Sequence, residues 1–269
     1  GMTEFFSNAW DGLVEGSKQA VDSVKKGWQN TKQWFADLWQ GIKDSASDMW
    51  QGTKQAFSDG VDNIRTAFQA VQQNIQGVYI CFDRKIMLAT RAVKVRTMNF
   101  DAFESVNIEP AGIVDARGLH FREDLLIHVD GAFKLEDQLC TDVFLIKLTP
   151  GMNPGIFDAL THMQFKGIVI EAFGAGGINF IRRDLISKLE EIVQKGISVV
   201  VCSQCLYENS DFSIYQTGQK VLKKGVIQGY DMTSEAALTK LMWALGKTQN
   251  PYEVKKLFET SFVHEITLK

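Results

Sequence analysis

Two short segments combine residue types and spacings that could support chemistry. Gly174-Ala-Gly176-Gly177 follows an apolar run and could be taken for a phosphate-binding loop, but the dinucleotide pattern needs a third glycine where this chain has Asn179. We interpret it as a tight turn that ends a strand. Cys202-Ser-Gln-Cys205 has the spacing of a redox pair or of half a zinc site. The chain has no second pair of this kind and its four histidines are scattered, so we interpret these cysteines as structural.

Lys94 is a third candidate, because it interrupts an otherwise apolar, alternating segment, AVKVRT. In such a strand a lysine usually faces solvent, since successive side chains point to opposite faces. Spacing alone assigns Lys94 no catalytic partner. The ordinary interpretation is therefore an outward-facing lysine.

The composition excludes several classes of protein. The 269 residues carry a net charge of −3 and no run of Lys and Arg, so we expect no nucleic acid partner. No apolar run approaches the roughly 20 residues that a membrane helix needs. The start, GMTEFF, lacks the features of a signal peptide, and four cysteines do not make a disulfide framework in a chain of this length. We therefore expect a cytoplasmic protein.

The first third of the chain repeats every eleven residues, in segments that begin at Trp28, Trp39, Trp50 and Val61. Eleven residues in three turns is about 3.67 residues per turn, so apolar side chains form one stripe along an α-helix that is straight or supercoils to the right. Several glycines weaken the helix, and a hairpin and a single rod are equally compatible with the pattern.

The apolar stripe must be covered by something. The simplest cover is the chain's own domain or a second copy of the chain. Residues 1–57 carry six Lys against seven acidic residues, which disfavours a membrane surface. WQGIKDSASDMWQGTKQ also resembles the repeats of phage tail tape-measure proteins, so a structural protein is an alternative.

From Gly77 on, the pattern is that of an α/β protein. GVYICF and AVKVRT, with a turn-like DRK between them, predict a pair of strands in a hairpin, and residues 99–140 read as a linker and loops. Beyond DVFLIKL, short apolar runs alternate with helical segments, which predicts a small parallel sheet covered on both faces. TSEAALTKLMWALG predicts a helix with Thr233 or Ser234 as its N-cap.

Several collinear segments resemble the bacterial L-asparaginase family, particularly its cytoplasmic type I branch. GYDMTSEAALTKLMWALG resembles the signature near the family's C-terminus, and weaker matches run back to about residue 58. The resemblance implies a larger α/β domain followed by a smaller one, hydrolysis of asparagine or glutamine without cofactor or metal, and dimers of dimers. We therefore expect a helical repeat at 1–57, a remnant of the family's first domain at 58–135 and its C-terminal α/β domain at 136–269.

The resemblance also defines what this sequence lacks. The family's nucleophile lies in a Thr-Gly-Gly-Thr-Ile loop and a second threonine in a Thr-Asp-Thr stretch, and neither motif occurs in these residues. Of the family's catalytic set, only Lys94 is matched, within Arg91-Ala-Val-Lys94. Ser203 and Cys205, followed by Tyr215, resemble the region of the family's effector site, where Glu171 replaces an arginine.

These departures predict a chain of the asparaginase family that is inactive alone and acts as a scaffold or an oligomerisation unit. We expect a homo-oligomer, and the ligand that the resemblance implies is a small amide such as asparagine. Two alternatives stay open. The chain is an active asparaginase or glutaminase when paired with a chain that carries the threonines, or it is a structural, phage-tail-like protein.

Overall fold

The computed structural model describes residues 2–97, 99, 101–132, 134–174, 184–210, 212 and 216–267. In the first helix, side chains are described at residues 15, 18, 19, 22 and 23 and from residue 25 onward. The chain divides into two units, residues 1–60 and residues 61–269. None of the described helices combines enough length with enough apolar character to cross a membrane.

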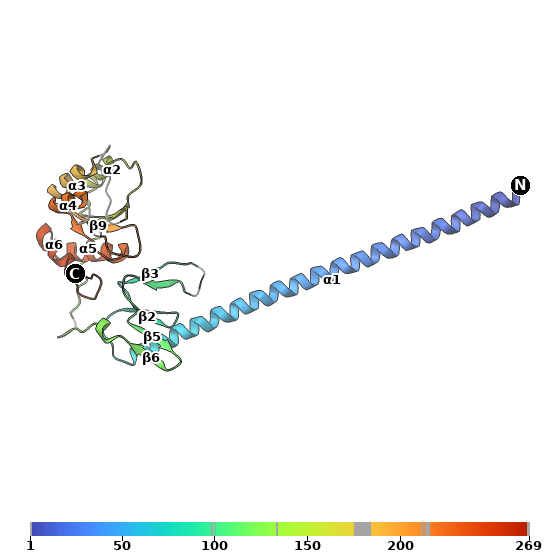
Figure 1. The fold of residues 1–269 in the computed structure, drawn as a ribbon, viewed down its shortest axis with the longest axis horizontal. Helices are drawn as coiled ribbons and strands as arrows, with labels where there is room; N and C mark the ends of the chain where they lie inside the picture. The colour runs from blue at the N-terminus through green and yellow to red at the C-terminus, as the bar shows by residue number, and fades with distance from the viewer. Residues whose placement is uncertain are drawn as a thin grey trace. The chain divides into compact units, whose positions relative to one another are not determined.

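A single helix, α1 (Met2–Val71), opens the chain and continues past the boundary between the two units (Figure 1). Of the two forms compatible with the repeat, the structure therefore has the single rod. Its contacts follow the repeat: Lys32, Lys43 and Lys54 lie over the rings of Trp28, Trp39 and Trp50, four residues earlier, at 5.7, 5.9 and 5.3 Å from the ring centroids. Glutamines donate to aspartates one turn later, as Gln33 does to Asp37 at 2.8 Å. Local pairs of this kind support a helix without any tertiary partner.

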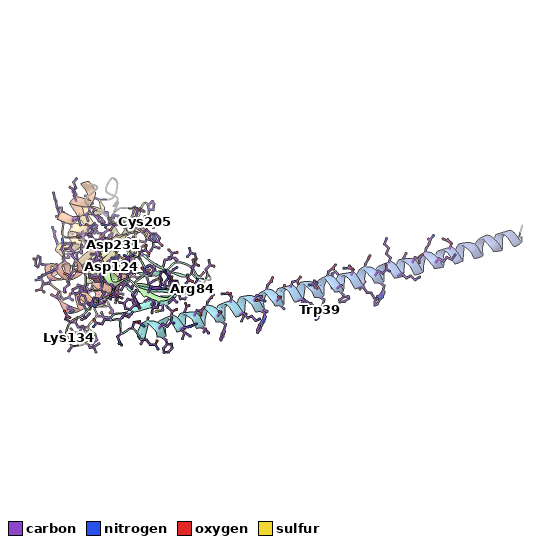
Figure 2. All side chains as sticks on the ribbon, turned by 60° about the horizontal axis from the view of Figure 1, so that its bottom comes forward. Trp39, Arg84, Asp124, Lys134, Cys205 and Asp231 are labelled. Atoms are coloured by element: carbon purple, nitrogen blue, oxygen red, sulfur yellow. The ribbon has the colours of Figure 1, made fainter. Side chains whose placement is uncertain are left out.

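The apolar stripe of α1 is exposed, and Figure 2 shows the side chain of Trp39 projecting from the helix. We define the stripe as the apolar residues at positions one, four, eight and eleven of the repeat that are between 46% and 75% exposed. They are Trp28, Phe35, Leu38, Trp39, Ile42, Met49, Trp50, Phe57, Val61, Ile64, Phe68 and Val71. The last turns of α1 belong to the second unit, and there a different face is buried. Thr66 and Ala70 are 3% and 4% exposed, and Asn63 Oδ1 accepts a hydrogen bond of 2.9 Å from the backbone N–H of Asp83. The helix therefore turns its small residues inward and its stripe outward.

The first strands after α1 form a hairpin, but with a partner other than the predicted one. β1 (Tyr79–Phe82) pairs antiparallel with β2 (Lys85–Leu88) through Asp83 and Arg84, which have φ of 48° and 58°. Two central residues with positive φ make a type I′ turn, which joins adjacent strands directly. The prediction that paired GVYICF with AVKVRT was wrong. Residues Ile86–Leu88 of β2 are all buried, so this short segment shows no apolar–polar alternation that would mark it as a strand.

The region expected to be a linker and loops contains further strands, so that prediction was also wrong. β3 (Ala92–Lys94) pairs with β4 (Phe103–Ser105), while β5 (Gly112–Asp115) and β6 (Gly118–Phe121) extend the first hairpin in the order β1-β2-β5-β6. A short 3-10 helix, η1 (Glu123–Leu125), follows. These strands have three or four residues, which is too short to establish a visible alternation in the sequence.

The C-terminal part of the chain has the predicted parallel sheet. Its described strands lie in the order β10-β9-β8-β7, and every neighbouring pair is parallel. The strands are β7 (Val143–Lys147), β8 (Gly167–Ala172), β9 (Ser198–Ser203) and β10 (Ile227–Gln228). The helices are α2 (Gly155–His162), α3 (Leu185–Gln194), α4 (Gln216–Lys223), α5 (Ser234–Lys247) and α6 (Pro251–Phe258).

Helices cover the two faces of this sheet, as predicted (Figure 1), and a hydrophobic core lies on each face. Ile168 and Ile170 of β8 point into the core shared with α2, α3 and α4, whereas Val169 points into the core shared with α5 and α6. Each buried side chain of this size contributes about 1.5–3 kcal/mol relative to an exposed one. The three connecting helices lie on one face because parallel crossovers are right-handed and the strand order progresses in one direction.

The predicted N-cap of α5 is confirmed at Thr233, and two further helix ends have ordinary capping geometry. Thr233 caps α5, accepting a hydrogen bond of 3.1 Å from the N–H of Ala236. Asn250 caps α6 and precedes Pro251. Gly196 follows α3 with φ of 85°, the left-handed conformation in which a helix commonly ends.

Candidate functional site

Lys94 lies at the end of β3 and is exposed. Its Nζ lies 5.9 Å from the ring centroid of Phe103, the residue paired with it across the hairpin. Among the described residues, no hydroxyl or carboxylate contacts this ammonium. Lys94 is therefore presented to solvent on an aromatic surface, as the ordinary interpretation of the sequence predicts.

The hairpin that carries Lys94 has a second polar cluster on its other face. Glu104 of β4 accepts hydrogen bonds from Arg96 at 2.9 Å and from the hydroxyl of Tyr207. These two donors hold the pKa of Glu104 below its ordinary value, and the carboxylate in turn raises the pKa of the Tyr207 phenol. This contact links the hairpin to the loop after β9.

A buried arginine anchors the start of β3. Arg91 is fully buried, and its guanidinium lies 3.0 Å from the carboxylate of Asp231. It also donates to the carbonyl oxygen of His264 at 2.6 Å and to Thr267 Oγ1 at 3.0 Å. Asn107 donates to the backbone oxygen of Asp231 at 2.9 Å. Because every one of these partners is distant in sequence, Arg91 fixes the strand of Lys94 to the C-terminal segment.

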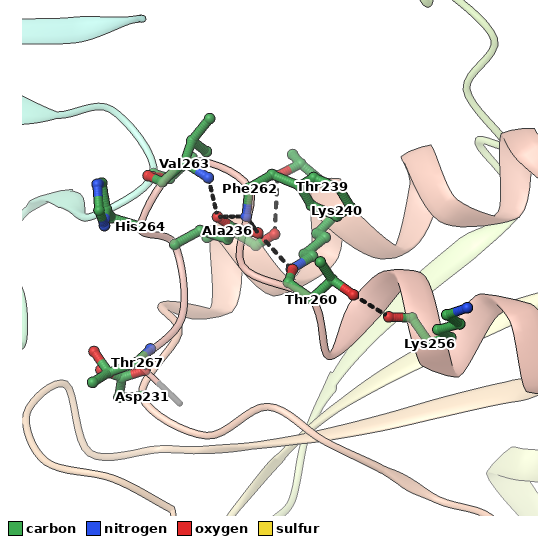
Figure 3. A network of polar contacts seen from close by, with 12 residues as sticks. Asp231, Ala236, Thr239, Lys240, Lys256, Thr260, Phe262, Val263, His264 and Thr267 are labelled. Atoms are coloured by element: carbon green, nitrogen blue, oxygen red, sulfur yellow. Dashed lines mark hydrogen bonds and ion pairs between the residues drawn. The ribbon is translucent and has the colours of Figure 1, made fainter. Parts of the chain in front are cut away.

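The same C-terminal segment is held by a buried ion pair (Figure 3). Lys240 Nζ lies 2.5 Å from Glu265 Oε1 and donates to the backbone oxygen of Thr260. Burial alone would raise the pKa of Glu265, but hydrogen bonds from Lys240 and from the N–H of Val263 outweigh it and lower that pKa. A cavity of about 240 Å³ lies beside the pair, with Trp243 and other largely apolar residues in its wall.

Ser203 and Cys205 line a small pocket at the carboxyl ends of β8 and β9. Its volume is about 100 Å³, and its described lining is Glu171, Ser203, Gln204, Cys205, Leu206, Met232, Thr233, Ser234 and Glu235. Ser203 Oγ donates to the backbone oxygen of Gly174 at 2.6 Å and accepts from the N–H of Cys205 at 2.9 Å. Gln204 donates to the backbone oxygens of Leu148 and Glu171 at 2.7 and 3.0 Å.

The charge of this pocket limits what it could hold. Glu171 and Glu235 bring two carboxylates, and the described lining includes no cationic side chain. Lys147 lies 3.5 Å from Glu171 but outside the lining. A pocket of this kind favours an amine or a hydroxyl over an anion, because like charges repel at short range.

The two cysteines of the CxxC segment differ in their surroundings. Cys202 is buried, and burial together with the charge of Glu171 raises the pKa of its thiol to about 12. A thiol with so high a pKa is a poor nucleophile. Cys205 is an exposed free thiol. The described part of the chain contains no group of three or more His, Cys, Asp and Glu side chains placed to hold a metal ion.

The structure thus brings Ser203, Cys205 and Glu171 together but does not bring Lys94 into their pocket. Gly174 follows β8 by two residues and has φ of 49°, while Gly176, Gly177, Asn179 and Tyr215 lie outside the described residues.

Sequence reasoning missed Arg91 and the Lys240–Glu265 pair, because charged residues are normally exposed and nothing local indicated their burial. It also missed that Thr233 lines the pocket. The position of Thr233 could have been predicted, because it follows a short strand of the same parallel sheet whose neighbouring strand ends at Ser203.

Two family models match this chain. The model described as "Asparaginase, N-terminal" matches residues 51–126, and the model described as "Glutaminase/Asparaginase C-terminal domain" matches residues 142–258. The chain belongs to the asparaginase family. The resemblance seen in the sequence from about residue 58 is confirmed at this level.

Individual relatives agree with this membership. The chain is 38% identical to an L-asparaginase of Thermococcus kodakarensis over 196 residues. These residues make up 73% of this chain and 59% of that protein. It is 40% identical over 185 residues to a subunit of the glutamyl-tRNA(Gln) amidotransferase of Pyrococcus abyssi, over 67% of this chain and 42% of that protein.

A solved structure confirms the fold class. The thermostable L-asparaginase from Thermococcus kodakarensis superimposes with a TM-score of 0.70 and 36% identity, covering 78% of this chain and 63% of that one. The chain therefore spans less than two thirds of the length of each of these relatives.

Proposed function

We propose that this chain does not hydrolyse asparagine or glutamine by itself and acts as a scaffold or oligomerisation unit built on an asparaginase-family fold. The observation that carries the proposal is the surroundings of Lys94. In this family a lysine at that position is expected to support a threonine base, and here its recorded contact is the ring of Phe103.

An amide hydrolase needs more than a lysine. A hydroxyl becomes a useful nucleophile only when a base removes its proton and donors hold the oxyanion. Ser105 lies on the same face of the hairpin as Lys94, because it is two residues beyond Phe103 on β4. Its Oγ is buried and has no hydrogen-bond partner among the described residues, so it lacks both access to substrate and a base.

The sequence supports the same proposal. Neither Thr-Gly-Gly-Thr-Ile nor Thr-Asp-Thr occurs among the 269 residues. Loss of a nucleophile alone removes most of the rate of an enzyme of this type. In the pocket around Ser203 and Cys205, the hydroxyl of Ser203 donates to the backbone oxygen of Gly174, and that of Thr233 is engaged as the N-cap of α5.

The test is ammonia release from asparagine and from glutamine by the purified chain. We expect none above buffer, and no change in Lys94→Ala. Lys256→Ala is the matched control, since Lys256 is also an exposed lysine and lies on α6, away from β3. Release that is lost in Lys94→Ala and kept in Lys256→Ala would overturn the proposal. Release that is lost in Ser105→Ala would point to an unexpected serine site.

A second candidate is an amidohydrolase completed by another chain. It is favoured by the exposure of Lys94 and by a relative that is named as an amidotransferase subunit. Mixing the chain with a separate fragment that carries the family's threonine motifs tests it. Activity that appears only in the mixture, and disappears with Lys94→Ala, would establish this candidate in place of the first.

Two further parts of the proposal are tested separately: that the protein is cytoplasmic, and the alternative that it is a phage-tail-like structural protein. Cell fractionation tests the first. The second predicts that α1 assembles into higher oligomers, which the experiments below distinguish from a pair.

A further inference from the structure

Among the described residues of each unit, nothing covers the apolar stripe of α1. In the last turns of the helix, where α1 is part of the second unit, Thr66 and Ala70 are buried while Ile64, Phe68 and Val71 are 60%, 68% and 73% exposed. The helix is packed there, yet the stripe faces away from the packing. The stripe is therefore not the face that packs the last turns of α1 against the second unit.

The stripe is large enough for a stable interface. A buried aromatic side chain covers about 150–250 Å², and the stripe has six aromatic members that are each more than half exposed. With its aliphatic members the stripe presents on the order of 1,000 Å², against about 800 Å² that each partner buries in a standard interface. Apolar patches on monomeric proteins rarely exceed a few hundred Å².

The charges beside the stripe select the orientation of a partner helix. Position five of the repeat holds Lys32, Lys43, Lys54 and Arg65, all along one edge of the stripe. Position seven, along the other edge, holds Trp34, Ser45, Ala56 and Ala67, and none of these is charged.

Two identical helices that pair antiparallel bring like edges together, whereas two that pair parallel bring unlike edges together. An antiparallel pair would therefore place its cationic rows opposite each other. A parallel pair would place each cationic row opposite uncharged residues, most of them small.

We propose that the stripe binds the stripe of a second copy of this chain, in parallel and in register, as a two-helix rod. The eleven-residue period gives this rod a right-handed supercoil. Parallel pairing places the asparaginase-like unit of each copy, residues 61–269, at the same end of the rod. The inference deepens the proposed scaffold role by naming its partner.

The mass of the full chain in solution is the first measurement. We expect twice the 30.2 kDa of one chain by light scattering. Trp28→Glu with Trp50→Glu should halve that mass, because each change places a carboxylate in the stripe. Gln29→Glu with Gln51→Glu is the matched control: the same charges, one residue further along, lie off the stripe and should leave the mass unchanged. Circular dichroism of each variant checks that α1 remains helical.

Cross-linking tests the orientation without disturbing the aromatic side chains. Thr31→Cys and Ile64→Cys, each in a Cys205→Ser background, place a thiol near either end of the stripe. A parallel pair in register brings both thiols opposite their own copies, so both variants should form disulfide-linked dimers on mild oxidation. In an antiparallel pair at most one of the two positions can lie opposite itself.

The inference would be overturned by a monomer in solution, by a dimer that survives the Trp→Glu changes, or by a disulfide in only one cysteine variant. A larger oligomer also contradicts the two-helix rod. A monomer whose tryptophan emission shifts to the blue on phosphatidylcholine or phosphatidylserine vesicles would assign the stripe to a lipid surface. These outcomes are independent of ammonia release, so pairing and inactivity can each fail alone.

Discussion

The repeat helix and the asparaginase-like unit are stabilised by opposite kinds of contact. Along residues 28–60, the recorded interactions join residues within a turn of one another, such as Lys54 over Trp50 and Gln55 to Asp59. In residues 61–269, the buried ion pairs Arg91–Asp231 and Lys240–Glu265 join segments that are distant in the sequence.

This difference explains how one helix can cross the boundary between the two units. A helix whose contacts are local can be extended from any helical end without altering a distant core. The unit that follows needs only a face of α1 that is small enough to be buried, and Thr66 and Ala70 provide it. The stripe is then free to continue across the boundary.

The largest expected effect is on the asparaginase-like unit. Arg91→Leu leaves Asp231 buried without its partner, and breaking such a pair costs about 3–5 kcal/mol of unfolding free energy. The exposed Arg96→Gln removes ion pairs with Asp101 and Glu104 and should cost less than about 1 kcal/mol. Denaturant unfolding of both variants measures this contrast. Equal costs would mean that the unit does not depend on its long-range pair.

A second effect comes from a glycine in the same unit. A Cβ at Gly246 of α5 would lie 2.1 Å from the carbonyl oxygen of Gln138, where backbone must move to admit it. Gly246→Ala should therefore destabilise the protein by about 1–3 kcal/mol despite the better helix propensity of alanine. Thermal unfolding measures it, and an unchanged or raised Tm would show that the segment at Gln138 is not packed on α5.

The buried Lys240–Glu265 pair predicts a dependence on pH. Because the folded protein lowers the pKa of Glu265, this carboxylate stabilises the fold above its ordinary pKa, 4.5, and the contribution is lost as the pH falls through the folded-state value. Unfolding free energies of the natural chain should therefore fall in acid more steeply than those of Glu265→Gln. Parallel pH profiles for the two would contradict the assignment.

The smallest effect has the opposite sign and lies in the repeat helix. A Cβ at Gly52 would meet nothing within 4 Å. Gly52→Ala should stabilise α1 by up to about 1 kcal/mol, since glycine is the poorer helix former by that amount. The ellipticity of α1 during thermal melting measures it. A loss of helix would show that Gly52 is in contact with a partner, which would also bear on the pairing of the stripe.

The candidate site was predictable only where it depends on local pattern. The strand endings that place Ser203 and Glu171 side by side follow from apolar runs in a parallel sheet, whose carboxyl ends share one edge. The exposure of Lys94 follows from its place in a short strand. Arg91 could not be predicted as buried, because the four recorded contacts of its side chain go to three residues, Asp231, His264 and Thr267, which are far from it in the sequence.

The pairing of the early strands failed for a related reason. A two-residue turn at Asp83 and Arg84 decides that Lys85–Leu88 is the partner of β1, and this needs positive φ at two residues that are not glycine. The sequence marks DRK as turn-like, but the short apolar run Ile86–Leu88 that follows shows no alternation, so nothing local identifies it as the partner strand of β1.

By itself, the sequence determined the period of α1, the alternation of strands and helices beyond residue 143, and the N-cap of α5, because each depends on residues within a few places of one another. Only the tertiary structure decided which face of α1 is buried and which polar groups lie inside. Burial depends on how closely segments can approach, and small side chains such as Thr66 and Ala70 permit an approach that the large side chains of the stripe do not.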